Sequence, residues 1–127
     1  MKEFLIVGIG SFVGGGMRFL VGRWMQHVAL LSLPIGTLTA NVVGCFLIGF
    51  FSGLPVGERW MSQETKLLLT TGLCGGFTTF STFINENLSL LREGQFTTLA
   101  LYAALSLGLG LLAVVAGHQL AKTVLSC

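Results

Sequence analysis

Charged residues are scarce in this chain of 127 residues, and aspartate is absent altogether. Charged residues make up 9% of the sequence, whereas about a quarter of the residues of a soluble globular domain are typically charged. The hydrophobic share is 53%, which indicates a membrane protein. A formal net charge of +2 is too small to indicate nucleic-acid binding, which depends on a strongly basic surface.

The groups that enzymes use are also missing. Without aspartate there is no Ser-His-Asp set, the serines have no plausible base partner, and the two histidines fall in or near the ends of apolar runs. The three cysteines, Cys45, Cys74 and Cys127, match neither a disulfide framework nor a metal-binding spacing. We interpret Cys45 and Cys74 as small packing residues, and we predict that the protein is not an enzyme.

Long apolar runs are what the sequence has in abundance. A helix needs about 20 apolar residues to cross a bilayer, and four runs are long enough. The first is not interpreted as a cleaved signal peptide, because it carries Arg18 and no Ala-x-Ala site follows it. We predict an all-α membrane protein with four transmembrane helices in a single domain, residues 1–127. The predicted spans are residues 4–24, 35–54, 67–91 and 96–121.

The third run contains the most unusual stretch of the chain, residues 72–83, which read GLCGGFTTFSTF. Paired glycines weaken a helix, and the hydroxyls of Thr78 and Thr79 can bond freed backbone groups. We predict that this third helix is broken at its centre, near Gly75 and Gly76, which frees carbonyls before the break and N–H groups after it. In a membrane such a break is a natural ion site. A glycine kink that only brings helices together is the alternative.

Polar and aromatic residues near this break are candidates for lining an ion path. Asn41, an amide in an uncharged run, either ties helices together or presents its NH₂ group to an anion. Phe80 and Phe83 share one helix face, and the positive edge of an aromatic ring can meet an anion. Tyr102 and Ser106, four residues apart in the fourth run, either face a pore or bond to a neighbouring helix.

Small residues and one arginine indicate how the helices are expected to pack. Gly10 and Gly14 form a G-x-x-x-G pair, which lets two helices approach closely. Arg18 lies about 20 Å along the first helix from residue 4. There it either snorkels to the far interface or faces a water-filled vestibule that attracts anions. Stripes of small residues recur in the second and fourth spans, at Gly36, Ala40 and Gly44 and at Ala100, Ala104 and Gly108.

Positive charge is spread almost evenly over the two predicted sides of the membrane. Four basic residues on the side of the N-terminus against three on the other give almost no bias under the positive-inside rule. Oppositely inserted copies can then form an antiparallel dual-topology homodimer, and a fixed orientation set by other features is the alternative. The four are Lys2, Arg59, Lys66 and Lys122, and the three are Arg18, Arg23 and Arg92.

Three ordered motifs resemble the bacterial CrcB/Fluc fluoride channels. The first is GGGMR at residues 14–18, the second is PIGTLTANVVG at residues 34–44, and the third is TGLCGGFTTFSTF at residues 71–83. Length, number of spans and motif order agree, so the resemblance covers nearly the whole chain. One departure is Ile84, where the family often has a serine.

The resemblance implies a fluoride-specific ion channel of the bacterial inner membrane, which passively exports fluoride to lower its cytoplasmic concentration. It implies an antiparallel homodimer with two pores and a structural sodium ion at its centre, which is not conducted. Backbone carbonyls of Gly75 and Thr78 from each subunit would hold the sodium. By the same resemblance Asn41, Phe80, Phe83, Ser81 and Thr82 line the fluoride pore, Tyr102 and Ser106 are weaker candidates, and Arg18 lies by the vestibule.

Two other classes of function fit part of the same pattern. A small proton-coupled multidrug exporter also has about four spans and is often dual-topology, but it needs an acid buried in the membrane. Glu3 lies at the edge of the first span, and Glu86 is the sole other candidate. A non-transporting assembly subunit would explain the small-residue stripes but not the aligned polar groups of the second and third spans. Growth assays with drugs and with fluoride separate the exporter from the channel, and a flux assay on the purified protein identifies a non-transporting subunit.

Overall fold

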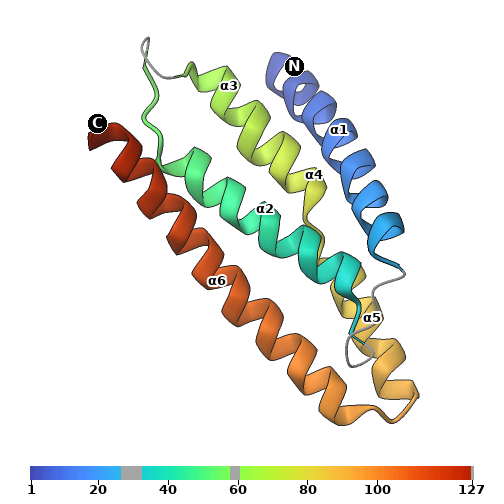
Figure 1. Ribbon diagram of the computed structural model, residues 1–127. Helices are drawn as coiled ribbons and strands as arrows, with labels where there is room; N and C mark the ends of the chain where they lie inside the picture. Colours follow the sequence, from blue (N-terminus) through green and yellow to red (C-terminus); the bar gives the residue numbers. More distant parts are fainter. Residues whose placement is uncertain (27–32, 58–60, 127) are drawn as a thin grey trace.

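Four long apolar helices dominate the structure, a computed structural model that describes residues 1–26, 33–57 and 61–126 (Figure 1). Each is long and apolar enough to cross a membrane. The expectation of an all-helical chain with four such helices is confirmed. The elements are α1 (Lys2–Met25), α2 (Ile35–Gly53), α3 (Gln63–Leu67), η1 (Leu68–Cys74), α4 (Gly75–Phe77), α5 (Phe80–Arg92) and α6 (Phe96–Ser126), of which α3, η1, α4 and α5 together make the third span.

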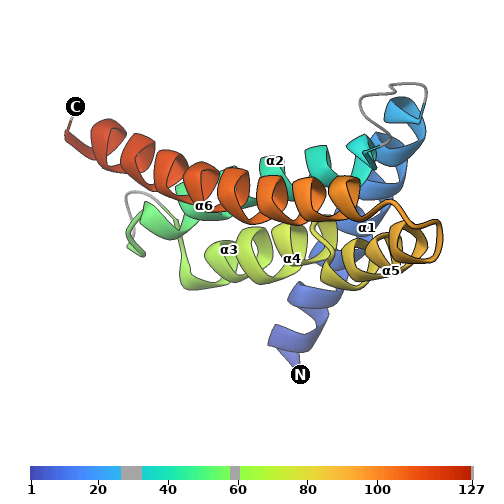
Figure 2. The ribbon, with the colours of Figure 1, turned by 90° about the horizontal axis from the view of Figure 1, so that it is seen from below.

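The helices pack mainly as two pairs. α2 runs alongside α6 (Figures 1 and 2), and α1 packs on η1 and α4, which it crosses obliquely in the view of Figure 2. The two members of each pair run in the same direction. Gly10 faces Gly72 and Gly14 faces Phe77 in one pair, and Gly49 faces Val114 and Gly53 faces Ala121 in the other. This is the arrangement expected of a chain that crosses a membrane back and forth through short links.

Glycine allows α1 to approach the third span closely. A Cβ atom on Gly10 would lie 2.8 Å from the Cα atom of Gly72, and one on Gly14 would overlap the carbonyl of Leu73. The Ser11 hydroxyl donates to the Gly72 carbonyl at 3.3 Å. The predicted close approach at the G-x-x-x-G pair is therefore confirmed.

The two other small-residue stripes behave differently. In α2, Ala40 is fully buried and Gly44 lies against the side chains of Thr78 and Phe77. In α6, the predicted packing face is wrong for the single chain, because its three residues are exposed and α6 instead packs on α2 through Gly117. The exposed residues are Ala100, Ala104 and Gly108.

Extended backbone separates α4 from α5. Thr78 has φ −87° and ψ 157°, and Thr79 has φ −151° and ψ 123°. Gly75 and Gly76 are themselves helical, and the extended residues follow this glycine pair. Gly76 serves close packing, because a Cβ atom there would lie 2.6 Å from the carbonyl oxygen of Ser11.

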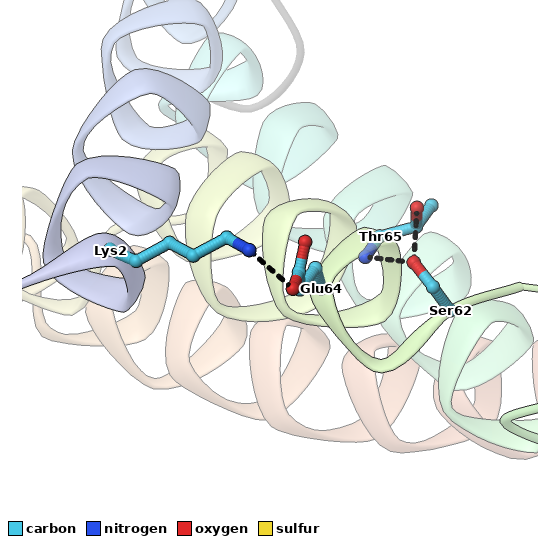
Figure 3. Close-up of polar contacts among 4 residues, drawn as sticks. All are labelled: Lys2, Ser62, Glu64 and Thr65. Atoms are coloured by element: carbon cyan, nitrogen blue, oxygen red, sulfur yellow. Dashed lines mark hydrogen bonds and ion pairs between the residues drawn. The ribbon is translucent and has the colours of Figure 1, made fainter.

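The third span begins at Gln63, earlier than the apolar run that predicted it. Ser62 caps its first turn, where Ser62 Oγ accepts the Thr65 N–H at 3.1 Å and donates to Thr65 Oγ1 at 2.9 Å (Figure 3). Lys2 Nζ and Glu64 Oε1 lie 2.8 Å apart and link the start of α1 to this turn (Figure 3). Polar capping thus extends the helix beyond its hydrophobic part. Of the residues named above, Arg59 and Cys127 lie outside the described residues.

A tight turn joins α5 to α6 and reverses the direction of the chain. Gly94 has a positive φ of 74°, which suits glycine. Its N–H donates to the Leu91 carbonyl at 3.1 Å, and the Gln95 N–H donates to the Leu90 carbonyl at 2.9 Å, as in a Schellman motif. The reversal brings α6 back along α5, so that Tyr102 lies within the cluster of buried side chains at this end.

Candidate ion pathway

Asn41 binds the backbone of Thr79 where the third span is not helical. The Thr79 N–H donates to Asn41 Oδ1 at 2.7 Å, and Asn41 Nδ2 donates to the Thr79 carbonyl at 3.0 Å. The amide thus replaces partners that a continuous helix would supply to the backbone. The sequence left two roles open for Asn41, a tie between helices and the binding of an anion. The structure shows the tie between helices. The NH₂ group carries a second N–H, which is the one suited to a ligand.

A groove of about 340 Å³ lies beside this pair, between α2, the third span and α6. It gathers predicted pore residues that are far apart in the sequence. Ser106 Oγ is buried and has no hydrogen-bond partner among the described residues. The described lining residues include no charged side chain. The predicted pore residues in the lining are Asn41, Phe80, Phe83 and Ser106.

Phe80 and Phe83 occupy different environments although they share a helix face. Their ring centroids lie 6.0 Å apart, with the ring planes tilted by 42°. Phe83 is buried and packs on the ring of Tyr102 at a centroid distance of 5.0 Å. Phe80 is 73% exposed. Phe83 therefore belongs to the core of the chain, whereas Phe80 projects from it beside the groove.

Three predicted pore residues do not line this groove, as far as the described residues define it. Ser81 is exposed, and its Oγ lies 3.5 Å from Thr79 Oγ1. The Thr82 N–H donates to Thr79 Oγ1 at 3.2 Å, which makes Thr79 the N-cap of α5. Tyr102 is fully buried. The structure thus separates Ser81, Thr82 and Tyr102 from the other four.

Glu86, which was not among the predicted residues of the ion path, forms a polar cluster with Tyr102 and Thr37. The Tyr102 hydroxyl donates to Glu86 Oε1 at 2.9 Å, and Thr37 Oγ1 donates to Glu86 Oε2 at 3.0 Å. Each carboxyl oxygen accepts from a different helix. Spacing is the signal that could have found the cluster, because Thr37 precedes Asn41, and Tyr102 precedes Ser106, by one helical turn.

Arg18 lines a second cavity, of about 430 Å³, near the end of α1. Arg23 and Gln26 line it as well, and no acidic residue is among its described lining residues. Arg18 Nε is buried without a hydrogen-bond partner in the described part of the chain. Two guanidinium groups at one cavity make it attractive to anions. Because Thr37 also lines this cavity, it adjoins the Glu86 cluster.

The carbonyls of Gly75 and Thr78 lose their helical donors at the extended residues. In a continuous helix the Thr79 N–H would bond to the Gly75 carbonyl, and the Thr82 N–H to the Thr78 carbonyl. Here Thr79 donates to Asn41, and Thr82 donates to the Thr79 side chain. Carbonyls of unwound membrane helices are ligands for sodium. These two carbonyls therefore fit a sodium ion by their chemistry.

Comparison with known proteins identifies the family. A family model described as "CrcB-like protein, Camphor Resistance (CrcB)" matches residues 5–118. The chain belongs to the CrcB family. The resemblance of the three motifs is thereby confirmed, and every predicted site residue of this CrcB protein, from Arg18 to Ser106, lies within the matched range.

Curated relatives of this CrcB protein are similar along nearly their whole length. A protein of Chlorobium phaeobacteroides strain BS1, named fluoride-specific ion channel FluC, is 48% identical over 118 residues, which are 93% of this chain and 91% of the relative. A second, from strain DSM 266 of the same species, has the same name and is 44% identical over 122 residues, 96% of this chain and 94% of its own. A third of that name, from Rhizobium etli, is 40% identical over 124 residues, 98% and 99% of the two chains. Their names describe channels rather than enzymes.

Proposed function

We propose that this CrcB protein is a fluoride-specific ion channel of the bacterial inner membrane, through which fluoride leaves the cytoplasm passively. Relatives that are 48% and 44% identical are named for this activity. The structural observation that carries the proposal is the uncharged groove where Asn41, Phe80, Phe83 and Ser106 meet. Four residues chosen from the sequence for anion chemistry come together there from three spans.

The groove suits an ion that is small and strongly hydrated. A fluoride pore must replace water with donors at close range, yet it must not hold the ion too tightly. The Ser106 hydroxyl, the second N–H of Asn41 and the ring edge of Phe80 are such donors without full charge. The cavity at Arg18 supplies positive potential outside the groove, where it concentrates anions without trapping them.

We assign supporting roles to the predicted pore residues outside the groove lining. Ser81, exposed beside Phe80, and Thr82 next to it continue the polar side of the path along α5. Tyr102 positions Glu86 through its hydroxyl, at 2.9 Å, and packs on Phe83. Fluoride that passes from the Arg18 cavity toward Asn41 follows the face of α2 that carries Thr37.

We further propose that two copies assemble as an antiparallel dual-topology homodimer. In a single chain the groove is open on one side, so its polar groups would face hydrocarbon, where unpaired polar groups are costly. A second copy removes this cost and encloses the path. The exposed face of α6 at Ala100, Ala104 and Gly108 offers small residues for the close approach of that copy.

A structural sodium ion at the carbonyls of Gly75 and Thr78 belongs to the same proposal. The support is that both carbonyls have lost their helical donors, and that Gly75 is exposed in the single chain, where a partner copy can approach it. When bound, the ion would neutralise carbonyl dipoles from both copies and join the two interrupted spans. The ion is structural and is not conducted.

One observation favours a small proton-coupled exporter as the second candidate. Such a protein needs an acid within the membrane, and Glu86 lies within a span and accepts two hydroxyl hydrogen bonds there. Growth of cells that carry the gene separates the candidates. A channel protects cells against fluoride and leaves drug tolerance unchanged. An exporter raises drug tolerance and leaves fluoride sensitivity unchanged.

The direct test is anion efflux from liposomes that hold the purified protein. We expect fluoride to leave while chloride is retained, and we expect Phe80→Ile to slow fluoride efflux by at least about tenfold, a barrier increase of about 1.4 kcal/mol. Phe4→Ile is the matched control, because Phe4 on α1 is also 73% exposed. Equal efflux of both anions would contradict fluoride selectivity, and an unchanged rate in Phe80→Ile would contradict the assigned path.

A further inference from the structure

Two cysteine thiols line the proposed ion path. Cys45 of α2 and Cys74 at the end of η1 are both free, and both line the groove of about 340 Å³. Packing accounts for the burial of Cys74, which is 1% exposed, but it does not require two thiols on one cavity wall. They come from different spans, at positions 29 residues apart in the sequence.

The two spans are in close contact where the thiols lie. Gly44, next to Cys45, packs so tightly that a Cβ atom there would overlap the Thr78 side chain, one helical turn beyond Cys74. Ser106 Oγ, which has no hydrogen-bond partner among the described residues, lies on the same cavity. The wall therefore combines two sulfur ligands with an unused oxygen.

We propose that Cys45 and Cys74 form a two-ligand site for a soft divalent metal ion that prefers linear coordination by sulfur, of the class of mercuric ion. Thiolate is the soft ligand among protein side chains and selects soft metals over sodium, magnesium or calcium. Linear coordination needs only two sulfurs, and the groove lining offers two, one from each of two spans. The described residues contain no group of three or more histidine, cysteine or acidic side chains for a metal that needs more ligands.

Charge favours a divalent ion at this site. Each thiol releases its proton to water, two sulfur–metal bonds replace two bonds from the metal to water or chloride, which leave to solvent, and the metal keeps its oxidation state, so no oxidant is needed. Two thiolates and one divalent ion make a neutral complex, which avoids burying a net charge in an apolar setting. A monovalent soft ion would leave one negative charge in a groove without charged lining residues.

Binding is tested with mercuric chloride on the full chain in detergent, with Cys127→Ser so that only the two groove thiols remain. Native mass spectrometry is expected to show one mercury and the loss of two protons per chain. In Cys45→Ala or Cys74→Ala, affinity is expected to fall at least about a hundredfold, because the second sulfur no longer acts at high effective concentration. Two mercury ions per chain, or single variants that bind as tightly as the pair, would overturn the site.

A second pair of variants keeps this test decisive. If an alanine variant does not elute as a folded protein on size exclusion, Cys45→Ser and Cys74→Ser replace it, because serine keeps the volume and removes the soft ligand. Their expected loss of affinity is the same. Undiminished binding in the folded serine variants would overturn the proposal.

The consequence for transport rests on the proposed function. Since the metal occupies the groove, fluoride efflux is expected to fall at least about tenfold at one mercury per chain and to recover when a dithiol chelator is added. Each cysteine variant is compared with its own rate before metal. Undiminished efflux with the metal bound would overturn the blocking role. Absence of efflux before metal is added would contradict the proposed channel, and the binding measurement alone would then test the metal site.

Discussion

Asn41 connects α2 to the extended residues of the third span through both backbone groups of Thr79, at 2.7 and 3.0 Å. Asn41→Ala would leave the partly buried N–H and carbonyl of Thr79 without partners, at about 1–2 kcal/mol for each, the lower part of the range for fully buried groups. We predict that this change lowers the free energy of unfolding by about 2–4 kcal/mol. Unfolding by denaturant in detergent micelles, followed by circular dichroism, measures the loss.

The matched control is Thr39→Val in the same helix, because the structure shows no side-chain hydrogen bond for Thr39 among the described residues. Its effect is expected to stay within about 0.5 kcal/mol, as for substitutions away from specific contacts. Comparable losses in the two variants would show that the Asn41 amide does not stabilise the extended residues.

Single residues of the site were predictable where they were out of place in an apolar run. Asn41 and Ser106 stand out in this way, and both lie on the groove. The cluster of Glu86 with Thr37 and Tyr102 was missed, because each residue taken alone has a simpler interpretation. Glu86 was considered only as the membrane acid of an exporter, and only the packing of α2, α5 and α6 brings the three residues together.

At the scale of the helix, the position of the extended residues shows why propensity alone misplaced them. Glycine lowers helix stability by about 1 kcal/mol per residue, which pointed to Gly75 and Gly76. Both remain helical, with Gly76 held against Ser11 of α1. The chain leaves the helix at Thr79 instead, where Asn41 and the capping hydroxyl supply other partners for the backbone. Asn41 is distant in sequence, so the sequence of the third span alone does not predict this partner.

The contact of α1 with the third span gives a prediction at the same scale. A Cβ atom on Gly14 would overlap the Leu73 carbonyl, whereas one on Gly15 would have no atom within 4 Å. We predict that Gly14→Ala lowers the free energy of unfolding by about 1–3 kcal/mol through overpacking. Gly15→Ala is the control, expected to be neutral or slightly stabilising, because alanine favours the helix. Unfolding in micelles measures both, and equal effects would contradict the observed approach of the helices.

At the scale of the whole molecule, the number of spans followed from hydrophobicity, but the faces that meet did not. All three small-residue stripes looked alike in sequence. Those of α1 and α2 are packed within the chain, while that of α6 is exposed. Membrane helices are apolar on every side, so hydrophobic pattern does not tell which face meets a helix and which meets lipid or a second copy.

Basic side chains at the two ends of the molecule bear on its orientation. Lys2 and Lys66 line one cavity, of about 540 Å³, at the start of α1, and Arg18 and Arg23 line the cavity near its end. Lys66 Nζ donates to the carbonyls of Leu54 at 3.0 Å and Ser52 at 3.2 Å, where it complements the end of α2. These four basic residues thus lie at the two ends of the molecule that the count assigned to them.

An antiparallel dimer requires both orientations of this chain, so variants that insert in one orientation are expected to fail alone. Gln63→Lys with Val124→Lys raises the count at the end of Lys2 from four to six against three. Lys2→Gln with Glu93→Lys and Gln95→Lys reverses the bias, to three against five. Loss of the exposed Lys2–Glu64 pair costs little stability.

We predict that each variant alone gives little fluoride protection and that co-expression restores it, because the positive-inside rule then supplies one copy of each orientation. Growth on fluoride measures protection, and labelling of cysteines placed at each end verifies orientation. Full protection by a variant shown to insert in one orientation would refute the antiparallel dimer while leaving the path within each chain to the efflux test.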